Sequence, residues 1–115
     1  MDPFPEQWEL ISLFEREPTL MDPGVPWIYN HVTFVLDRAG ERIECMIHEA
    51  DREVAFRWLV GGRTVVQLEL TDVVGLEVSH GEDTEGLTVT TSDAGRRLMI
   101  QISPDVRVVW SADTR

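Results

Sequence analysis

The sequence has little of the material that secreted and membrane proteins are built from. Its single cysteine, Cys45, excludes a disulfide within the 115-residue chain, so a reducing cytoplasm is the expected environment. No apolar run approaches the roughly 20 residues that a membrane-spanning helix needs. The opening residues, 1–4, also lack the basic start and apolar stretch of a signal peptide. We therefore expect a cytoplasmic protein of one domain, residues 1–115, that does not enter a membrane.

Positive charge is scarce. Lysine is absent, and ten arginines face twenty-one acidic residues, which gives a formal net charge of −11. Nucleic acids and anionic membrane surfaces both require a cationic footprint, so we expect neither as a partner. The excess of negative charge has two interpretations that remain open: it keeps a small protein soluble, or it steers the chain toward a basic protein partner.

Catalytic and metal-binding motifs are also missing from the sequence. There is no G-x-S-x-G nucleophile turn, no glycine-rich phosphate loop and no H-E-x-x-H spacing. The histidines His31, His48 and His80 form no close pair along the chain, and we interpret them as surface residues. No carboxylate is marked as desolvated by its sequence neighbours. The expectation is a chain with no catalytic residue, no metal site and no cofactor.

One helix is predicted near the N-terminus, over residues 5–16. Pro5 suits a first helical position, and Trp8, Ile11 and Phe14 recur at helical spacing. We interpret this apolar stripe as core packing. Pro18 closes the helix, and residues 19–26 are predicted to form a loop.

From residue 27 to residue 111 the sequence alternates between apolar and polar side chains, which predicts an antiparallel sheet. The central hairpin turns near two glycines, at 61–62. A two-residue turn there would place Phe56 opposite Gln67 and split the apolar residues between two faces, whereas a three-residue loop, 60–62, places Phe56 opposite Val66. We therefore predict the three-residue loop.

Further two-residue turns keep the apolar side chains on one face along the rest of the chain. They are predicted at 39–40, 50–51 and 94–95, where they pair Leu36 with Ile43, Ile47 with Val54, and Thr91 with Leu98. The predicted fold is α+β and mostly β: an N-terminal helix followed by a strongly curved antiparallel meander of about eight strands, with the helix over the concave face. Whether the sheet closes into a barrel is left open.

What remains as a functional signal is the surface. Trp27 and Tyr29 point away from the inferred core beside a Pro-Gly loop, and acidic residues gather around the predicted turn near residue 82. Exposed aromatics among carboxylates are typical of a surface that binds a cationic protein. The candidate partner-binding residues are Trp27, Tyr29, Asp72, Glu77, Glu82, Asp83 and Glu85.

Four short segments add a family resemblance: ELI at 9–11 with Phe14, PTLMDPGV at 18–25, LDR at 36–38 and LTDVVGLE at 70–77. In these segments the chain resembles bacterial immunity proteins of polymorphic toxin systems, most of all the immunity protein 50 type. The resemblance implies a cytoplasmic bacterial protein, a monomer or weak dimer, that binds one cognate toxin domain and occludes it without performing a reaction. An acidic immunity protein suits a basic toxin such as a nuclease.

Two other functions remain open on the sequence. The chain could be a structural or assembly module of a phage or secretion system, which would form homo-oligomers through exposed strand edges. It could also bind a small ligand, if the inward-facing residues line a cavity instead of filling a core.

Overall fold

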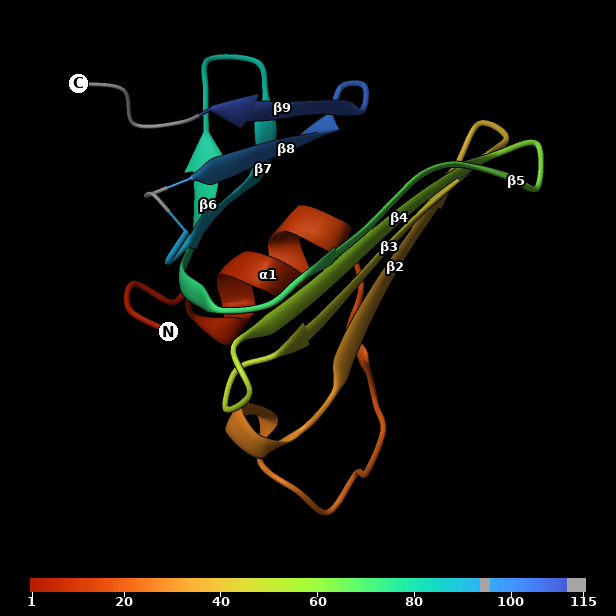
Figure 1. Ribbon diagram of the computed structural model, residues 1–115. Helices are drawn as coiled ribbons and strands as arrows, with labels where there is room; N and C mark the ends of the chain where they lie inside the picture. The colour runs from red at the N-terminus through yellow and green to blue at the C-terminus, as the bar shows by residue number, and fades with distance from the viewer. Residues whose placement is uncertain (94–95, 112–115) are drawn as a thin grey trace. The chain divides into compact units, whose positions relative to one another are not determined.

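Two separate antiparallel sheets make up most of the computed structural model, which describes residues 1–93 and 96–111 (Figure 1). One sheet has the strand order β1-β2-β3-β4-β5 and the other β6-β7-β8-β9. The described elements are the helix α1 (Gln7–Phe14), the 3₁₀ helix η1 (Trp27–Tyr29), and the strands β1 (Thr19–Leu20), β2 (Val32–Arg38), β3 (Glu41–His48), β4 (Glu53–Val60), β5 (Arg63–Leu70), β6 (Val73–His80), β7 (Glu85–Thr91), β8 (Arg97–Ser103) and β9 (Arg107–Ser111).

The predicted class is confirmed: a mostly β, antiparallel α+β chain that begins with a helix. The single continuous meander is instead divided between β5 and β6, which do not pair. The division falls at Asp72, whose φ of 54° turns the chain between the two strands. Large, strongly twisted sheets commonly split in this way. The additional strand is β1, in a segment predicted to be a loop.

Two compact units can be distinguished by their internal contacts. One consists of residues 14–71 and the other combines residues 1–13 with those from 72 onward. A single domain over 1–115 stays a prediction. The largest fully buried side chains of the first unit are Phe14, Phe34, Ile43, Val54 and Phe56, and those of the second are Leu10, Val73, Leu76, Leu87, Leu98, Ile100 and Ile102. In the first unit the rings of Phe14 and Phe34 stack with centroids 4.9 Å apart.

The helix is shorter than predicted, Gln7–Phe14 instead of 5–16. At its start, the backbone N–H of Glu6 donates to Oε1 of Glu9 at 2.9 Å, as in half of a capping box. At its end, Glu15 takes a φ of 61°, which no α-helix continues, so the helix stops before Pro18. Among the described residues there is no helix long and apolar enough to cross a membrane.

The strand predicted from residue 27 starts later in the structure. Residues 27–29 form η1 instead of a strand, and β2 begins at Val32. A strand with alternating sides from residue 27, with Trp27 and Tyr29 outward, places Ile28 inward; this expectation is wrong, since the Ile28 side chain is 42 % exposed. A hydrogen bond of 2.9 Å from the N–H of Ala50 to the carbonyl of Ile28 fixes η1 beside the turn after β3.

Two of the predicted turns have the predicted register. Ala39 and Gly40 take φ values of 43° and 80°, as a primed hairpin turn requires, and Leu36 lies opposite Ile43. Around the turn at 50–51, Ile47 lies opposite Val54.

The three-residue loop predicted for the central hairpin is wrong. Gly61 and Gly62 form a two-residue turn, with φ values of 57° and 79°. A β-bulge then follows, because the register shifts beside Trp58 and leaves Val65 as the extra residue of β5. The bulge sets Phe56 opposite Leu68 instead of Val66, so the apolar side chains still share one face.

The register predicted on the two sides of residues 94–95 is wrong. Residues 94–95 lie outside the described part of the chain. On either side of them Val89, not Thr91, lies opposite Leu98. The N–H of Thr91 instead donates to the carbonyl of Arg96 at 2.9 Å.

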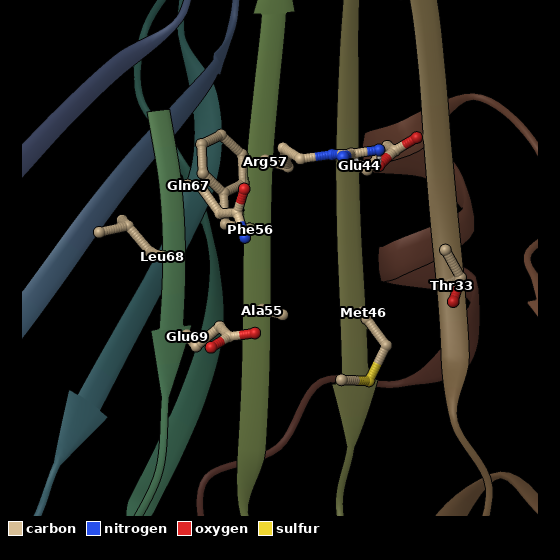
Figure 2. A pocket seen from close by; sticks show the side chains of 9 residues that line it. All are labelled: Thr33, Glu44, Met46, Ala55, Phe56, Arg57, Gln67, Leu68 and Glu69. Atoms are coloured by element: carbon tan, nitrogen blue, oxygen red, sulfur yellow. Dashed lines mark hydrogen bonds and ion pairs between the residues drawn. The ribbon is translucent and has the colours of Figure 1, made fainter. Parts of the chain in front are cut away.

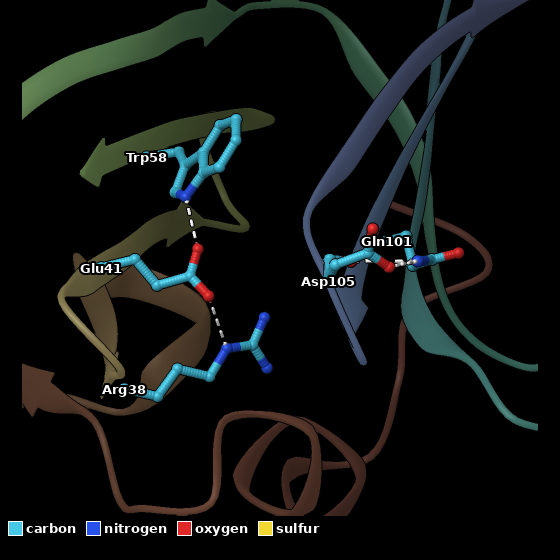
Figure 3. A network of polar contacts seen from close by, with 5 residues as sticks. All are labelled: Arg38, Glu41, Trp58, Gln101 and Asp105. Atoms are coloured by element: carbon cyan, nitrogen blue, oxygen red, sulfur yellow. Dashed lines mark hydrogen bonds and ion pairs between the residues drawn. The ribbon is translucent and has the colours of Figure 1, made fainter.

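A polar network fastens the hairpin of β2 and β3 to β4 (Figure 3). Glu41 accepts a hydrogen bond of 2.8 Å from Nε1 of Trp58 and one of 2.9 Å from Nε of Arg38. The Arg38 and Glu41 side chains are only 22 % and 19 % exposed, so water competes weakly for these groups. The same figure draws a separate contact between β8 and the following turn, where Nε2 of Gln101 donates to Oδ1 of Asp105 at 3.0 Å.

We predict that Glu41→Ala lowers the free energy of unfolding by about 1–3 kcal/mol, because it removes the acceptor of a part-buried indole N–H. The matched control is Asp37→Ala. It breaks an ion pair with Arg42 that is half exposed on both sides, and it should cost less than about 1 kcal/mol. Urea unfolding of the three proteins measures the difference; equal losses in the two variants would contradict the prediction.

Candidate functional site

The segment 21–30, here called the 21–30 loop, is held by one buried amide. Asn30 is 3 % exposed. Its Nδ2 donates to the carbonyls of Asp22 and Val25, at 2.6 and 3.0 Å, and its Oδ1 accepts from the N–H of Asp22 at 3.2 Å. A buried side chain with this many backbone partners fixes the path of the segment around it. Hydrogen bonds within the loop therefore fix its conformation, and no partner protein is needed for this.

This loop presents large apolar side chains to solvent. Met21 is 74 % exposed, Tyr29 65 % and Ile28 42 %. Exposed apolar and aromatic groups on a preformed segment are typical of interaction sites, because little conformational entropy is lost when they are covered. Of the two aromatics proposed from sequence, Tyr29 is free to contact a partner. Trp27 is half-buried, with its ring edge-on to Phe34 at a centroid distance of 6.0 Å, so it also packs into its own unit.

The predicted acidic residues belong to the second unit, with β6 and β7. Glu77 is exposed on β6, and Glu82 and Asp83 are exposed in the loop before β7. No ion pair within residues 1–93 and 96–111 involves these three carboxylates. Glu85, at the start of β7, lies 3.5 Å from Nδ1 of His80. We call Glu82, Asp83 and Glu85 the acidic tip.

Asp72 lies apart from the acidic tip. It precedes β6, whereas the tip follows β6, and an eight-residue strand separates the two by about 25 Å. The sequence-based grouping of Asp72 with the tip rested on closeness along the chain, which an extended strand does not preserve.

On the outer face of the first sheet, charges are paired. Glu44 lies 2.7 Å from Arg57 and 3.3 Å from Arg42. This pairing borders a shallow hollow of about 210 Å³ on β2 to β5, which also exposes Met46 and Glu69 (Figure 2). The hollow mixes apolar groups, the paired charges of Glu44 and Arg57, and the carboxylate of Glu69, so it offers a contact surface.

Two of the three histidines, His31 and His48, lie close together, whereas the sequence predicted separate surface residues. One ligand atom each from His31, His48 and Glu53 lie within 4.8 Å of one another, and the two imidazole rings have centroids 4.2 Å apart. The surface position predicted for His48 is wrong, because this residue is only 8 % exposed. The predicted turns already imply that these residues are neighbours. The turn that pairs Leu36 with Ile43 places His31 beside His48. The turn that pairs Ile47 with Val54 places His48 beside Glu53. Spacing along the chain alone does not show this cluster, because its three residues lie in or next to different strands.

The single cysteine is expected to be unreactive in the folded protein. Cys45 lies on β3, fully buried, and burial raises the pKa of its thiol to about 12. The thiolate, which is the reactive form, is therefore disfavoured at physiological pH.

Comparison with solved structures finds the same fold in a toxin–immunity complex. A chain of the "Contact-dependent growth inhibition toxin - immunity protein complex from Klebsiella pneumoniae 342" matches with a TM-score of 0.79 and 14 % sequence identity, over 93 % of each chain. No protein-family model matches the sequence, and no curated protein matches it. The structural match agrees, at the level of the fold, with the resemblance to immunity proteins found in the sequence.

We predict that Cys45 of the native protein resists a thiol reagent at pH 8, since its pKa of about 12 leaves almost no thiolate there. The same chain in concentrated guanidinium chloride serves as the control and should react at once. Labelling of the native protein as fast as that of the unfolded chain would contradict the burial of this thiol.

Proposed function

We propose that this chain is a bacterial immunity protein that binds a cognate toxin domain and occludes it. The observation that carries the proposal is the match of fold over 93 % of both chains to a member of a toxin–immunity complex. Such a complex has two kinds of component. The acidic composition and the immunity-like segments at 9–14, 18–25, 36–38 and 70–77 favour the immunity component for this chain. The likeness to the immunity protein 50 type in particular stays a prediction.

The proposed mechanism is occlusion by binding alone. The 21–30 loop offers Met21, Ile28 and Tyr29 as anchors that are already in position, which lowers the entropic cost of association. Neutralising a toxin in this way requires at least a standard interface, about 1,600 Å² in total. The protein supplies shape and charge, and no bond is made or broken.

The partner we propose is basic, for example a nuclease domain. A net charge of −11 attracts a cationic surface over long range, and Glu77, Glu82 and Asp83 keep their charge uncompensated by any ion pair of the described residues. Contacts of this kind raise the association rate more than they raise the final affinity. We place the protein in the bacterial cytoplasm as a monomer or weak dimer, where it meets a toxin that has entered the cell or is newly made.

Co-expression with the toxin domain encoded beside this chain's gene tests the proposal directly. We expect the toxin domain alone to stop growth of the host, the pair to restore growth, and the two chains to co-purify in equal amounts. A toxin from an unrelated system is the control and should stay active. Continued growth arrest with both chains expressed as folded proteins would refute the proposal.

A second prediction concerns the acidic tip. Reversing Glu82 and Asp83 to arginine should slow association with that toxin domain by about tenfold or more at low salt, because both charges contribute to steering. The difference should shrink at high salt, where charges are screened. The matched control reverses the exposed Asp2 and Glu17, which changes the net charge equally. Stopped-flow association rates measure the effect; the same rate in both double variants would remove the tip from the interface.

A further inference from the structure

The ends of three neighbouring strands bring two imidazoles and a carboxylate to one face of the first sheet. His48, the last residue of β3, lies directly opposite Glu53, the first residue of β4. On the other side of β3, Val32 lies opposite Ile47, so His31 is next to His48 as the chain enters β2. Because side chains alternate along each strand, these three residues share the face opposite Val32, Ile47 and Val54.

The geometry of this trio is that of potential ligands. One nitrogen or oxygen atom from each residue lies within 4.8 Å of the other two. In a tetrahedral zinc site with bonds of about 2.0–2.1 Å, neighbouring ligand atoms are about 3.3 Å apart. The three atoms therefore need to approach each other by about 1.5 Å at most, which is within the reach of side-chain rotation on a fixed backbone.

His48 shows an unusual polar environment. It is 8 % exposed, and its Nδ1 is buried without a hydrogen-bond partner. Oδ2 of Asp51 lies 3.0 Å from this nitrogen, which is the distance of an ion pair when the imidazole is protonated. Buried imidazole nitrogens are normally satisfied by a donor, an acceptor or a metal. A carboxylate next to a histidine also occurs regularly behind metal-bound imidazoles, where it orients the ring.

We propose that His31, His48 and Glu53 bind a zinc-type divalent cation. Two imidazoles and one carboxylate are a set that Zn²⁺ takes in proteins, with the fourth position left to a water molecule or to an incoming group. The donor set disfavours Mg²⁺ and Ca²⁺, which prefer oxygen ligands alone. This inference rests on the strand register and does not depend on the proposed function.

The site lies at the base of the 21–30 loop. The N–H of Met21 donates to the carbonyl of His31 at 3.1 Å, and that of Ala50 donates to the carbonyl of Ile28 at 2.9 Å. A cation here would join the entry of β2, the end of β3 and the start of β4. It would thereby fasten the segment that presents Met21, Ile28 and Tyr29.

The test is titration of the metal-free full chain with Zn²⁺ alone, in competition with a chromophoric chelator. Millimolar Mg²⁺ is present throughout, so that scattered surface carboxylates do not contribute. We expect one Zn²⁺ per wild-type chain and a melting temperature that rises with Zn²⁺ concentration, since a ligand of the folded state stabilises it. His31→Gln and Glu53→Gln should each bind at least about tenfold more weakly and lose most of the shift in melting temperature.

The matched control is His80→Gln, which removes a histidine that also lies near a glutamate, at 3.5 Å, but outside the trio. It should bind Zn²⁺ as the wild type does. His31 and Glu53 are both partly exposed, so these two variants are expected to fold, and circular dichroism of the metal-free proteins checks this. The proposed site would be overturned if the wild-type chain did not bind one Zn²⁺. It would also be overturned if Glu53→Gln folded and bound Zn²⁺ as tightly as the wild type does. Equal loss in His80→Gln would do the same.

Discussion

The apolar side chains of these hairpins must stay on one face of each sheet, because exposing them to water costs more than distorting a strand does. The central hairpin makes the constraint visible. Its glycine turn alone would place Phe56 opposite Gln67, and the bulge at Val65 restores an apolar neighbour, Leu68. Phe56 is 1 % exposed as a result. The buried face therefore determines the register, and the backbone adjusts through a bulge.

The same constraint leaves the opposite face and the connecting loops available for binding. Side chains there lie in rows across neighbouring strands, so residues distant in sequence become neighbours, as His31, His48 and Glu53 do. Arg42 and Arg57 on the outer face are compensated by Glu44, whereas Glu82 and Asp83 are not compensated by any described cation. The proposed recognition of a partner rests on this uncompensated charge and on the exposed side chains of the 21–30 loop.

Sequence reasoning was successful where local chemistry decides the structure. The helix near the N-terminus, the antiparallel class and the turns at 39–40 and 50–51 follow from periodicity, turn residues and cross-strand charge pairs. It failed where nonlocal packing decides. No local signal distinguishes a bulge at Val65 from a longer loop, or shows that the sheet divides at Asp72.

The candidate site was predicted less completely. Tyr29 and the acidic tip are exposed as the sequence indicated, but Trp27 lies in a 3₁₀ helix and packs partly inward, because Asn30 organises the loop through contacts that no periodicity reports. The histidine trio was derivable from the predicted register, since two correct turns determine which residues of three strands lie side by side. Chemical groups in β proteins are thus better sought across strands than along them.

We propose that the 21–30 loop and the acidic tip bind a toxin domain and that the protein itself carries out no reaction. Amide hydrogen exchange of this chain, with and without a toxin domain that it neutralises on co-expression, is the direct test. We expect slower exchange in residues 21–29 and 81–85 when the toxin is bound, and unchanged exchange in the core of β3, where Cys45 lies. A stable complex in which both segments exchange as fast as in the free protein would contradict it.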